Sequence, residues 1–495
     1  MRNDRSWRLV GPAALVAAGV AGLVVLELVS PRNLRTGFAA QSTRTWLAGD
    51  HHVHSEFSVD YNDSTTPPTP IRGADGRYAI SLNAENARRY GLSWMVSTDH
   101  GGPNHSKLNR DIAYPELLRA RKAVPELLLF YGMEFDTPAA DHSSLVIPFF
   151  PNERDMLYDI ESRFAKRDKF PRDGSWDTEP RIVEALTHMK GLERPPVLIA
   201  NHPARSATGV GAYGQDTPKE FRDWNDAAPR VAVGMEGAPG HQAGSINRDG
   251  SRDTSGARGG YDRQVTFGGF DQMTARVGGL WDSMLGEGRR WWITSTSDSH
   301  RNWRDGGSDF WPGEYSKTYV LAARNHDDVL DGLRGGRVFV TTGDLISELD
   351  LTAEQVGAAS ARAGIGGTLT VAPGSDVRVT IRVRDPRGEN AHGDTPMVSR
   401  VDLITGAVTG RVADRTTDAN ATARVVARFT QAEWKRNGEY LEMSHVLRDV
   451  RGPLYLRVRG TSGTELEPQP DPRGEDPWGD LWFYANPTFV ELRAK

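Results

Sequence analysis

Gly49-Asp50-His51-His52-Val53-His54 is the most informative stretch of this chain, because it places three histidines directly after an apolar run at 46–48. Residues two apart on a β-strand point to the same face, so His52 and His54 can bind one ion while His51 points away. A lone His-x-His pair is weak evidence. Four more segments of this kind also follow apolar runs, and together they indicate a polynuclear metal site: Ser97-Thr98-Asp99-His100, Gly132-Met133-Glu134, Asn201-His202-Pro203 and Ser297-Asp298-Ser299-His300.

The spacing of apolar runs predicts an α/β architecture between residues 46 and 340. Short continuous apolar runs are typical of strands buried on both faces. They occur at 46–48, 92–96, 127–131, 144–150, 197–200, 231–233, 291–294 and 318–322. Helical patterns fall at 81–90, 114–124, 178–190 and 325–334. This alternation fits a barrel or a doubly wound sheet. Ligand residues directly after strand ends favour the barrel, whose active site lies at that face.

The pattern changes near residue 345. Alternating segments such as 377–383 (VRVTIRV) are separated by turn signals, which predicts an antiparallel β-sandwich over 345–495. This part contains only His392 and His445, so the chemistry is expected upstream. Within the α/β part, segments 152–176 and 241–270 are long insertions that are either surface loops or functional lids.

The N-terminal segment predicts export. Arg2, Arg5 and Arg8 precede an uncharged stretch at 9–26, which is typical of a signal peptide or an uncleaved signal-anchor helix over residues 1–29. A linker follows at 30–45. An apolar core helix is the alternative, but the terminal position and the flanking arginines disfavour it. We therefore expect an extracellular protein, or a membrane-anchored one with its catalytic part outside the cytoplasm.

Composition limits the metal chemistry and the partners. The 495 residues include no cysteine, which excludes disulfides, thiolate ligands and cysteine nucleophiles. Nitrogen and oxygen ligands suit Zn, Mn or Fe. The net charge of −5 gives no basic footprint, so no nucleic-acid partner is expected.

Several single residues have two readings. Asp60 could lie in a loop that returns to bind a metal ion, or it could be an ordinary turn residue. Glu236 could line the site or be a ligand. Asp99 could orient a ligating histidine. The candidates for substrate contact are Asn104, His105 and Arg205, although His105 could equally be a loop residue and Arg205 a surface ion-pair partner.

With these motifs in this order, residues 46–340 resemble the PHP (polymerase and histidinol phosphatase) family. The resemblance implies a distorted (β/α)7 barrel, here at 46–344, holding two or three divalent ions, commonly Zn, Mn or Fe. Glu134 would bridge two ions, and Glu134, Asp298 and His300 would be catalytic. Asp60 stands where some members have His and others Asp. Carried over motif by motif, the nine metal ligands fall on His52, His54, Asp60, His100, Glu134, His142, His202, Asp298 and His300.

The family resemblance implies a metal-dependent phosphoesterase, in which a hydroxide bridging two ions attacks a small-molecule or polymer phosphate ester. Segments 336–343 (GRVFVTTG) and 476–482 (DPWGDLW) resemble a branch that includes carboxyl-ester and carbamate hydrolases, which is the alternative on the same site. Only Arg205, Lys107 and Arg110 supply positive charge near the motifs, which leaves that alternative open. A non-catalytic surface-binding module that keeps metals for stability is disfavoured, because all nine ligand types are present.

Overall fold

The computed structural model describes residues 44–358 and 361–493. The predicted signal segment at 1–29, and nearly all of the linker, lie outside the described residues. Within the described ranges, no helix combines the length and the apolar character that crossing a membrane requires.

One large mixed sheet organises the strands of the N-terminal part. Three parallel strands come first, β1 (Thr45–Asp50), β4 (Trp94–Ser97) and β5 (Leu128–Asp136). β6 (His142–Val146) is antiparallel to both of its neighbours. Parallel pairing then resumes through β7 (Val197–Ala200), β8 (Ala232–Ala238) and β9 (Trp292–Ser295).

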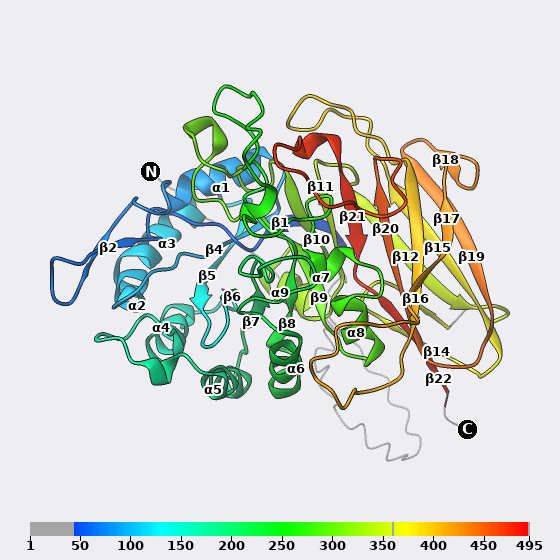
Figure 1. Ribbon diagram of the computed structural model, residues 1–495, viewed down its shortest axis with the longest axis horizontal. Coiled ribbons are helices and arrows are strands. Elements are labelled where there is room, and N and C mark those ends of the chain that lie inside the picture. Colours follow the sequence, from blue (N-terminus) through cyan, green and yellow to red (C-terminus); the bar gives the residue numbers. More distant parts are fainter. Residues whose placement is uncertain (1–43, 359–360, 494–495) are drawn as a thin grey trace, which may run out of the picture. The chain divides into compact units, whose positions relative to one another are not determined.

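Helices connect these strands, and Figure 1 shows α4, α5 and α6 in succession beside the middle strands. The four helices predicted from sequence are present, each within one residue or so of its predicted bounds. In each of them the apolar spacing and the residues at the helix ends indicate the same bounds. They are α1 (Ile80–Arg89), α3 (Tyr114–Ala123), α5 (Glu179–Lys190) and α9 (His326–Arg334). Two more are α4 (Glu153–Phe164), inside the insertion 152–176, and α6 (Pro218–Ala227).

The predicted (β/α)7 barrel is not confirmed. β10 (Ser316–Ala322) pairs antiparallel with β1, and no backbone ladder between the described strands joins it to β9. Side chains connect these strands instead: Ser295 N–H donates to Thr318 Oγ1 (2.8 Å), whose hydroxyl donates to Ser295 O (2.7 Å). Beyond the strand ends, a single parallel bridge joins Val53 to Ser299. The sheet therefore curves until β9 lies beside β10, and this brings the segments after β1 and β9 together.

The C-terminal strands continue the same sheet. β11 (Val338–Thr342) pairs with β21 (Trp482–Ala485), which pairs with β20 (Leu454–Thr461). The remaining strands of this sheet are β14 (Thr368–Val371), β16 (Arg400–Ala407), β17 (Arg424–Phe429) and β22 (Thr488–Leu492). A separate antiparallel sheet contains β12 (Glu348–Gln355), β13 (Arg362–Ala363), β15 (Ser375–Arg384), β18 (Lys435–Asn437) and β19 (Tyr440–Val450). Strands on both sides of residue 344/345 thus pair within one sheet. The division into two domains at that point stays a prediction.

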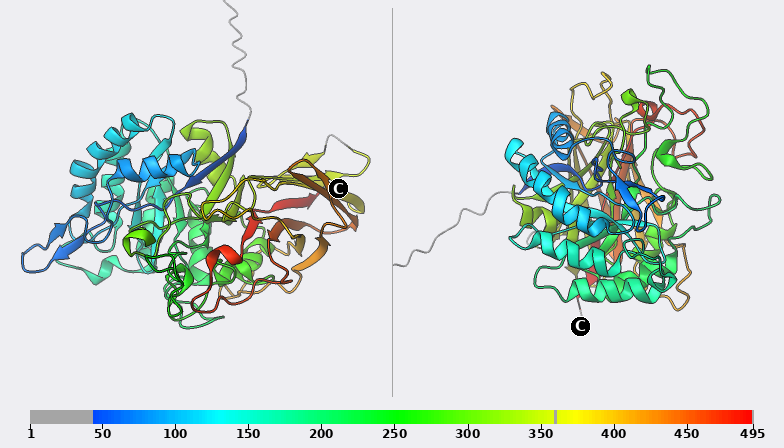
Figure 2. Two further views of the ribbon diagram at one scale, coloured as in Figure 1. Left: turned by 90° about the horizontal axis from the view of Figure 1, so that it is seen from above. Right: turned by 90° about the vertical axis from the view of Figure 1, so that its left-hand side faces the viewer.

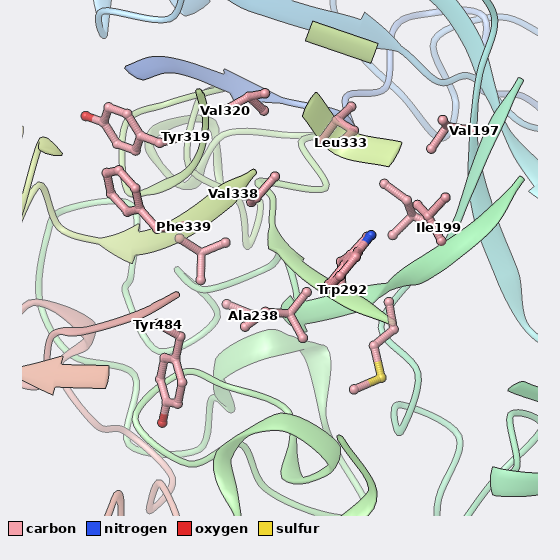
Figure 3. Close-up of a cluster of buried hydrophobic side chains, with 14 of the residues drawn as sticks. Val197, Ile199, Ala238, Trp292, Tyr319, Val320, Leu333, Val338, Phe339 and Tyr484 are labelled. Carbon is pink, nitrogen blue, oxygen red and sulfur yellow. The ribbon is translucent and has the colours of Figure 1, made fainter. Parts of the chain in front are cut away.

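Both parts share buried apolar contacts. Figure 3 shows one cluster that extends from β7 and β9 to β10, β11 and β21. Tyr319 stacks on Phe339 with ring centroids 4.6 Å apart, and Phe270 lies 4.3 Å from Tyr484. The views in Figure 2 show the orange and red C-terminal strands packed beside green segments of the earlier chain. These contacts fix the strand ends that position the site.

Candidate metal centre

The structure brings together every predicted metal ligand except Asp60. They converge at the carboxyl-terminal edge of the curved sheet because parallel strands present their ends to one edge. They are His52 and His54 after β1, His100 after β4, Glu134 in β5, His142 opening β6, His202 after β7, and Asp298 and His300 after β9.

Two carboxylates and two imidazoles form the deepest part of the centre. His52 Nε2 lies 3.0 Å from Glu134 Oε1 and 3.1 Å from Asp298 Oδ1. His54 Nε2 lies 3.5 Å from Glu134 Oε2 and 3.2 Å from Asp298 Oδ1. All four side chains are almost fully buried. Groups of this kind, at these separations, have the donor atoms that a divalent ion requires.

Glu134 also faces a second pair of imidazoles. His142 Nδ1 lies 3.2 Å and His202 Nε2 lies 3.1 Å from Glu134 Oε1. The Asn201 side chain donates to the same oxygen at 3.0 Å. Because Glu134 lies between two sets of histidines, its carboxylate is placed to serve two ions.

A third group lies nearer the mouth. His100 Nε2 and His300 Nε2 approach Asp75 Oδ2 at 3.1 and 3.4 Å. Asp60, by contrast, is exposed on the hairpin strand β2 (Asp60–Asn62). Sequence reasoning missed Asp75, which lies in a loop with no apolar run before it.

The donor spacing fits metal binding. Ligands 2.0–2.1 Å from a tetrahedral zinc ion lie about 3.3 Å apart, and the distances between Glu134, Asp298 and their histidines range from 3.0 to 3.5 Å. His202 Nδ1, an outer atom, has no hydrogen-bond partner among the described residues, and neither do three buried atoms that face the other ligands: His54 Nε2, Asp298 Oδ1 and Asp75 Oδ2. Unsatisfied buried polar atoms are costly, and a cation would satisfy these.

Outer partners orient most of these imidazoles by their other nitrogens, as ligating histidines generally require. His52 Nδ1 lies 2.7 Å from Glu236 Oε1, and His54 Nδ1 lies 2.7 Å from Ser58 Oγ. Ser58 in turn donates to Asp99 Oδ1 at 3.1 Å. Glu236 is thus placed in the wall of the centre, and Asp99 acts on His54 through Ser58. Asp136, two residues after Glu134, lies 3.3 Å from His142 Nε2.

The buried carboxylates are held in their ionised form. Burial alone would raise the pKa of Glu134, but the imidazoles of His142 and His52 outweigh it and hold this pKa well below its usual range. Burial likewise opposes ionisation of Asp298, and His241 and His52 outweigh it. In the metal-free protein the positive charge resides on these imidazoles, so metal binding must release protons.

Two arginines and one further histidine line the mouth. Arg205 Nη2 and His241 Nε2 lie 2.7 and 3.1 Å from Asp298 Oδ2, and His241 Nδ1 bonds Asp309. Arg167 Nε donates to Asp136 Oδ1 at 2.6 Å, and its Nη2 lies 3.3 Å from His100 Nδ1. Arg167 and His241 lie in the two insertions, 152–176 and 241–270. The sequence pattern of these insertions did not predict that either residue lies at the centre.

Backbone strain coincides with the centre. His202, His241 and Asp298 adopt positive φ angles of 31°, 54° and 47°. Such conformations cost on the order of 1–3 kcal/mol each in residues other than glycine, and they concentrate at functional sites. No sequence pattern revealed them.

Two predicted substrate contacts are placed away from the metal-binding atoms. His105 is buried, with Nδ1 2.5 Å from Glu161 and Nε2 3.0 Å from Phe57 O, so its role is structural. Asn104 Oδ1 accepts from Lys107 Nζ at 2.6 Å at the start of a short helix. Of the three predicted contacts, only Arg205 lies at the centre.

Comparisons with known proteins place the chain in no family. No family model matches it, and no curated protein matches it. A solved structure of Endonuclease Q, in complex with a 27-mer duplex that has an abasic lesion at the active site, matches with 14% identity and a TM-score of 0.27. The match covers 59% of this chain and 57% of that one.

The prediction excluded nucleic acid as a partner. This exclusion was wrong, since the matched structure is an enzyme bound to duplex DNA. The expectation relied on a net charge of −5, which is a sum over the whole surface. Local fields and bound cations decide what a site accepts. What the described residues define is a mixed α/β protein with a buried centre of histidine and carboxylate side chains.

Proposed function

We propose that this chain is a metal-dependent hydrolase of the PHP type that acts on phosphate esters. The observation that supports it most is Glu134, whose carboxylate lies between two pairs of imidazoles at 3.0–3.5 Å. Two or three divalent ions (Zn, Mn or Fe) held there would polarise the phosphoryl group and lower the pKa of a water nucleophile.

Asp298 connects the ion-binding atoms of the centre with the groups at its mouth. Its Oδ1 faces His52 and His54, while its Oδ2 is held by Arg205 and His241. This arrangement leaves Oδ1 free to bind an ion while Asp298 stays ionised. Glu134 and His300 complete the proposed catalytic set by fixing the ions on either side.

Positive charge at the mouth favours a phosphate ester over a carboxyl ester. Arg205 and Arg167 lie on different sides of the cluster, one beside Asp298 and one beside His100. Guanidinium groups bind phosphoryl oxygens strongly. Lys107 and Arg110, which the sequence also offered, bond Asn104 and Asp111 instead. No hydrogen bond or ion pair among the described residues joins the segments 336–343 and 476–482 to the predicted metal ligands; Pro477 O, for example, accepts from Tyr315.

Loss of the central ligands should abolish both metal binding and turnover. We expect His52→Ala with Asp298→Ala to lose its metal, measured by elemental analysis, and its activity on p-nitrophenyl phosphate. Asp60→Ala is the matched control, because Asp60 is an exposed carboxylate outside the cluster.

A substrate panel tests the ester class. It contains p-nitrophenyl phosphate, bis-p-nitrophenyl phosphate, p-nitrophenyl acetate and a duplex oligonucleotide. Hydrolysis of the acetate alone would favour the carboxyl-ester alternative, and full phosphatase activity in the metal-free double variant would refute the metal mechanism.

A further inference from the structure

We propose that Asp75, together with His100 and His300, forms a mouth-side metal position that exchanges its ion more readily than the buried part of the centre. This inference rests on the proposed metal centre. It assigns to Asp75 the ligand role that the family resemblance gave to Asp60.

The three donor atoms have the spacing of a metal site. Asp75 Oδ2 lies 3.1 Å from His100 Nε2 and 3.4 Å from His300 Nε2, close to the roughly 3.3 Å expected between ligands of a tetrahedral ion. These three ligands leave a fourth position for water, as in zinc sites that keep an open position. Asp75 Oδ2 itself is shielded from solvent and has no hydrogen-bond partner in the described part of the chain.

The loop that contains Asp75 is fixed against the segments that contain His54 and His300. Gly73 N–H donates to Glu56 O (3.0 Å), and Gly76 N–H donates to Ser58 O (3.1 Å). Next to Gly76, Arg77 N–H donates to His300 O (3.1 Å), so the backbone is held both before and after Asp75.

Gly76 makes this close approach possible. A Cβ at that position would lie 2.0 Å from Ser55 O, so any side chain there would push the loop away. Asp75 is therefore positioned by the backbone on both sides, and its contact with the two histidines does not depend on a flexible segment.

Exposure separates this position from the buried one. The side chains of Asp75, His100 and His300 are 31%, 15% and 16% exposed. Those of His52, His54, Glu134 and Asp298 are 0–2% exposed. An ion held by the first group lies nearer to solvent, so a chelator reaches it with a smaller opening of the site than release of a buried ion requires.

The test counts metal ions and follows their release in the full chain. The protein is loaded with zinc, dialysed and analysed for zinc per chain, and release to a chromogenic chelator is recorded over time. We expect a fast and a slow phase in the wild type. Asp75→Asn should lose the fast phase or bind that ion at least about tenfold more weakly, with the slow phase unchanged.

Three matched variants make the outcome specific. Asp60→Asn removes an equivalent exposed carboxylate and should keep both phases. Asp75→His restores a ligand and should restore the fast phase, which separates lost ligation from a disturbed loop. His52→Ala should remove the slow phase.

The outcomes distinguish the two proposals. Unchanged zinc content and release in Asp75→Asn, or loss of the fast phase in Asp60→Asn, would overturn the role of Asp75 while leaving the metal centre intact. A wild-type chain that binds no zinc, manganese or iron would overturn the metal centre itself. Circular dichroism of each variant confirms that the fold is retained.

Discussion

At the scale of single residues, the carboxylates at the bottom of the centre determine what the site can do. Glu134 and Asp298 are buried and ionised, and every imidazole around them has one nitrogen directed inward. The sequence predicted these residues because each ligand follows a buried strand. It could not predict Asp75, Arg167 or His241, because their positions depend on loops that no local pattern specifies.

Arg167 provides the first residue-scale prediction. Arg167→Ala should raise KM for p-nitrophenyl phosphate by roughly 10- to 100-fold, since a hydrogen bond to a charged group contributes about 1.5–3 kcal/mol. Metal content should stay the same. Arg110→Ala, which removes an arginine paired with Asp111 outside the cluster, should leave KM unchanged. Steady-state kinetics and metal analysis decide the matter, and an unaltered KM in Arg167→Ala would rule out phosphate binding by this guanidinium.

His105 gives a pH-dependent prediction. Burial alone would lower the pKa of His105, but the carboxylate of Glu161 outweighs it and raises this pKa to about 9. The unfolded value is about 6.5. The stabilisation by charged His105 is therefore complete below pH 6.5 and is lost as the pH rises through 9. It amounts to at most about 3 kcal/mol.

Urea unfolding of the metal-loaded wild type and His105→Gln measures this effect. The difference in unfolding free energy between the two should shrink between pH 6 and pH 10. A difference that is constant over this range would show that His105 stays neutral in the folded protein.

At the scale of elements, helix positions followed from the sequence, and strand pairing only in part. α1, α3, α5 and α9 begin and end near the predicted residues, because apolar spacing is a local property. The antiparallel direction of β6 depends on the short connection from Asp136 to His142, and a run of apolar residues does not encode direction. The helix α4 was missed because its segment is dense in charge, although its buried face is formed by residues such as Leu157 and Ile160.

At the scale of the whole molecule, buried ion pairs connect the two halves of the chain. Asp282, in the helix α8 (Leu280–Gly286), accepts from Arg457 Nε and Nη2 of β20 at 2.8 and 2.7 Å, and both side chains are fully buried. The predicted sandwich gave no indication of this contact, since residues 175 apart in sequence pair only after folding.

Removing one partner should be strongly destabilising. Asp282→Asn leaves the Arg457 guanidinium buried without a counter-charge, which typically costs about 3–5 kcal/mol. Asp350→Asn breaks the partly exposed pair with Arg382 and should cost less than about 1 kcal/mol. Urea denaturation of both variants gives the comparison, and equal losses would mean that Arg457 finds another partner.

The side chain of Asn486 has a consequence for biosynthesis. It accepts from Ile293 N–H at 2.9 Å and donates to Ile293 O at 3.2 Å, while its own N–H donates to Val338 O. The strand β9, the last in the order of the large sheet, therefore receives two of its amide contacts from a residue 193 positions later. On a translating ribosome this edge stays bare until that residue has emerged, so the catalytic half should mature after synthesis and depend on chaperones in the interval.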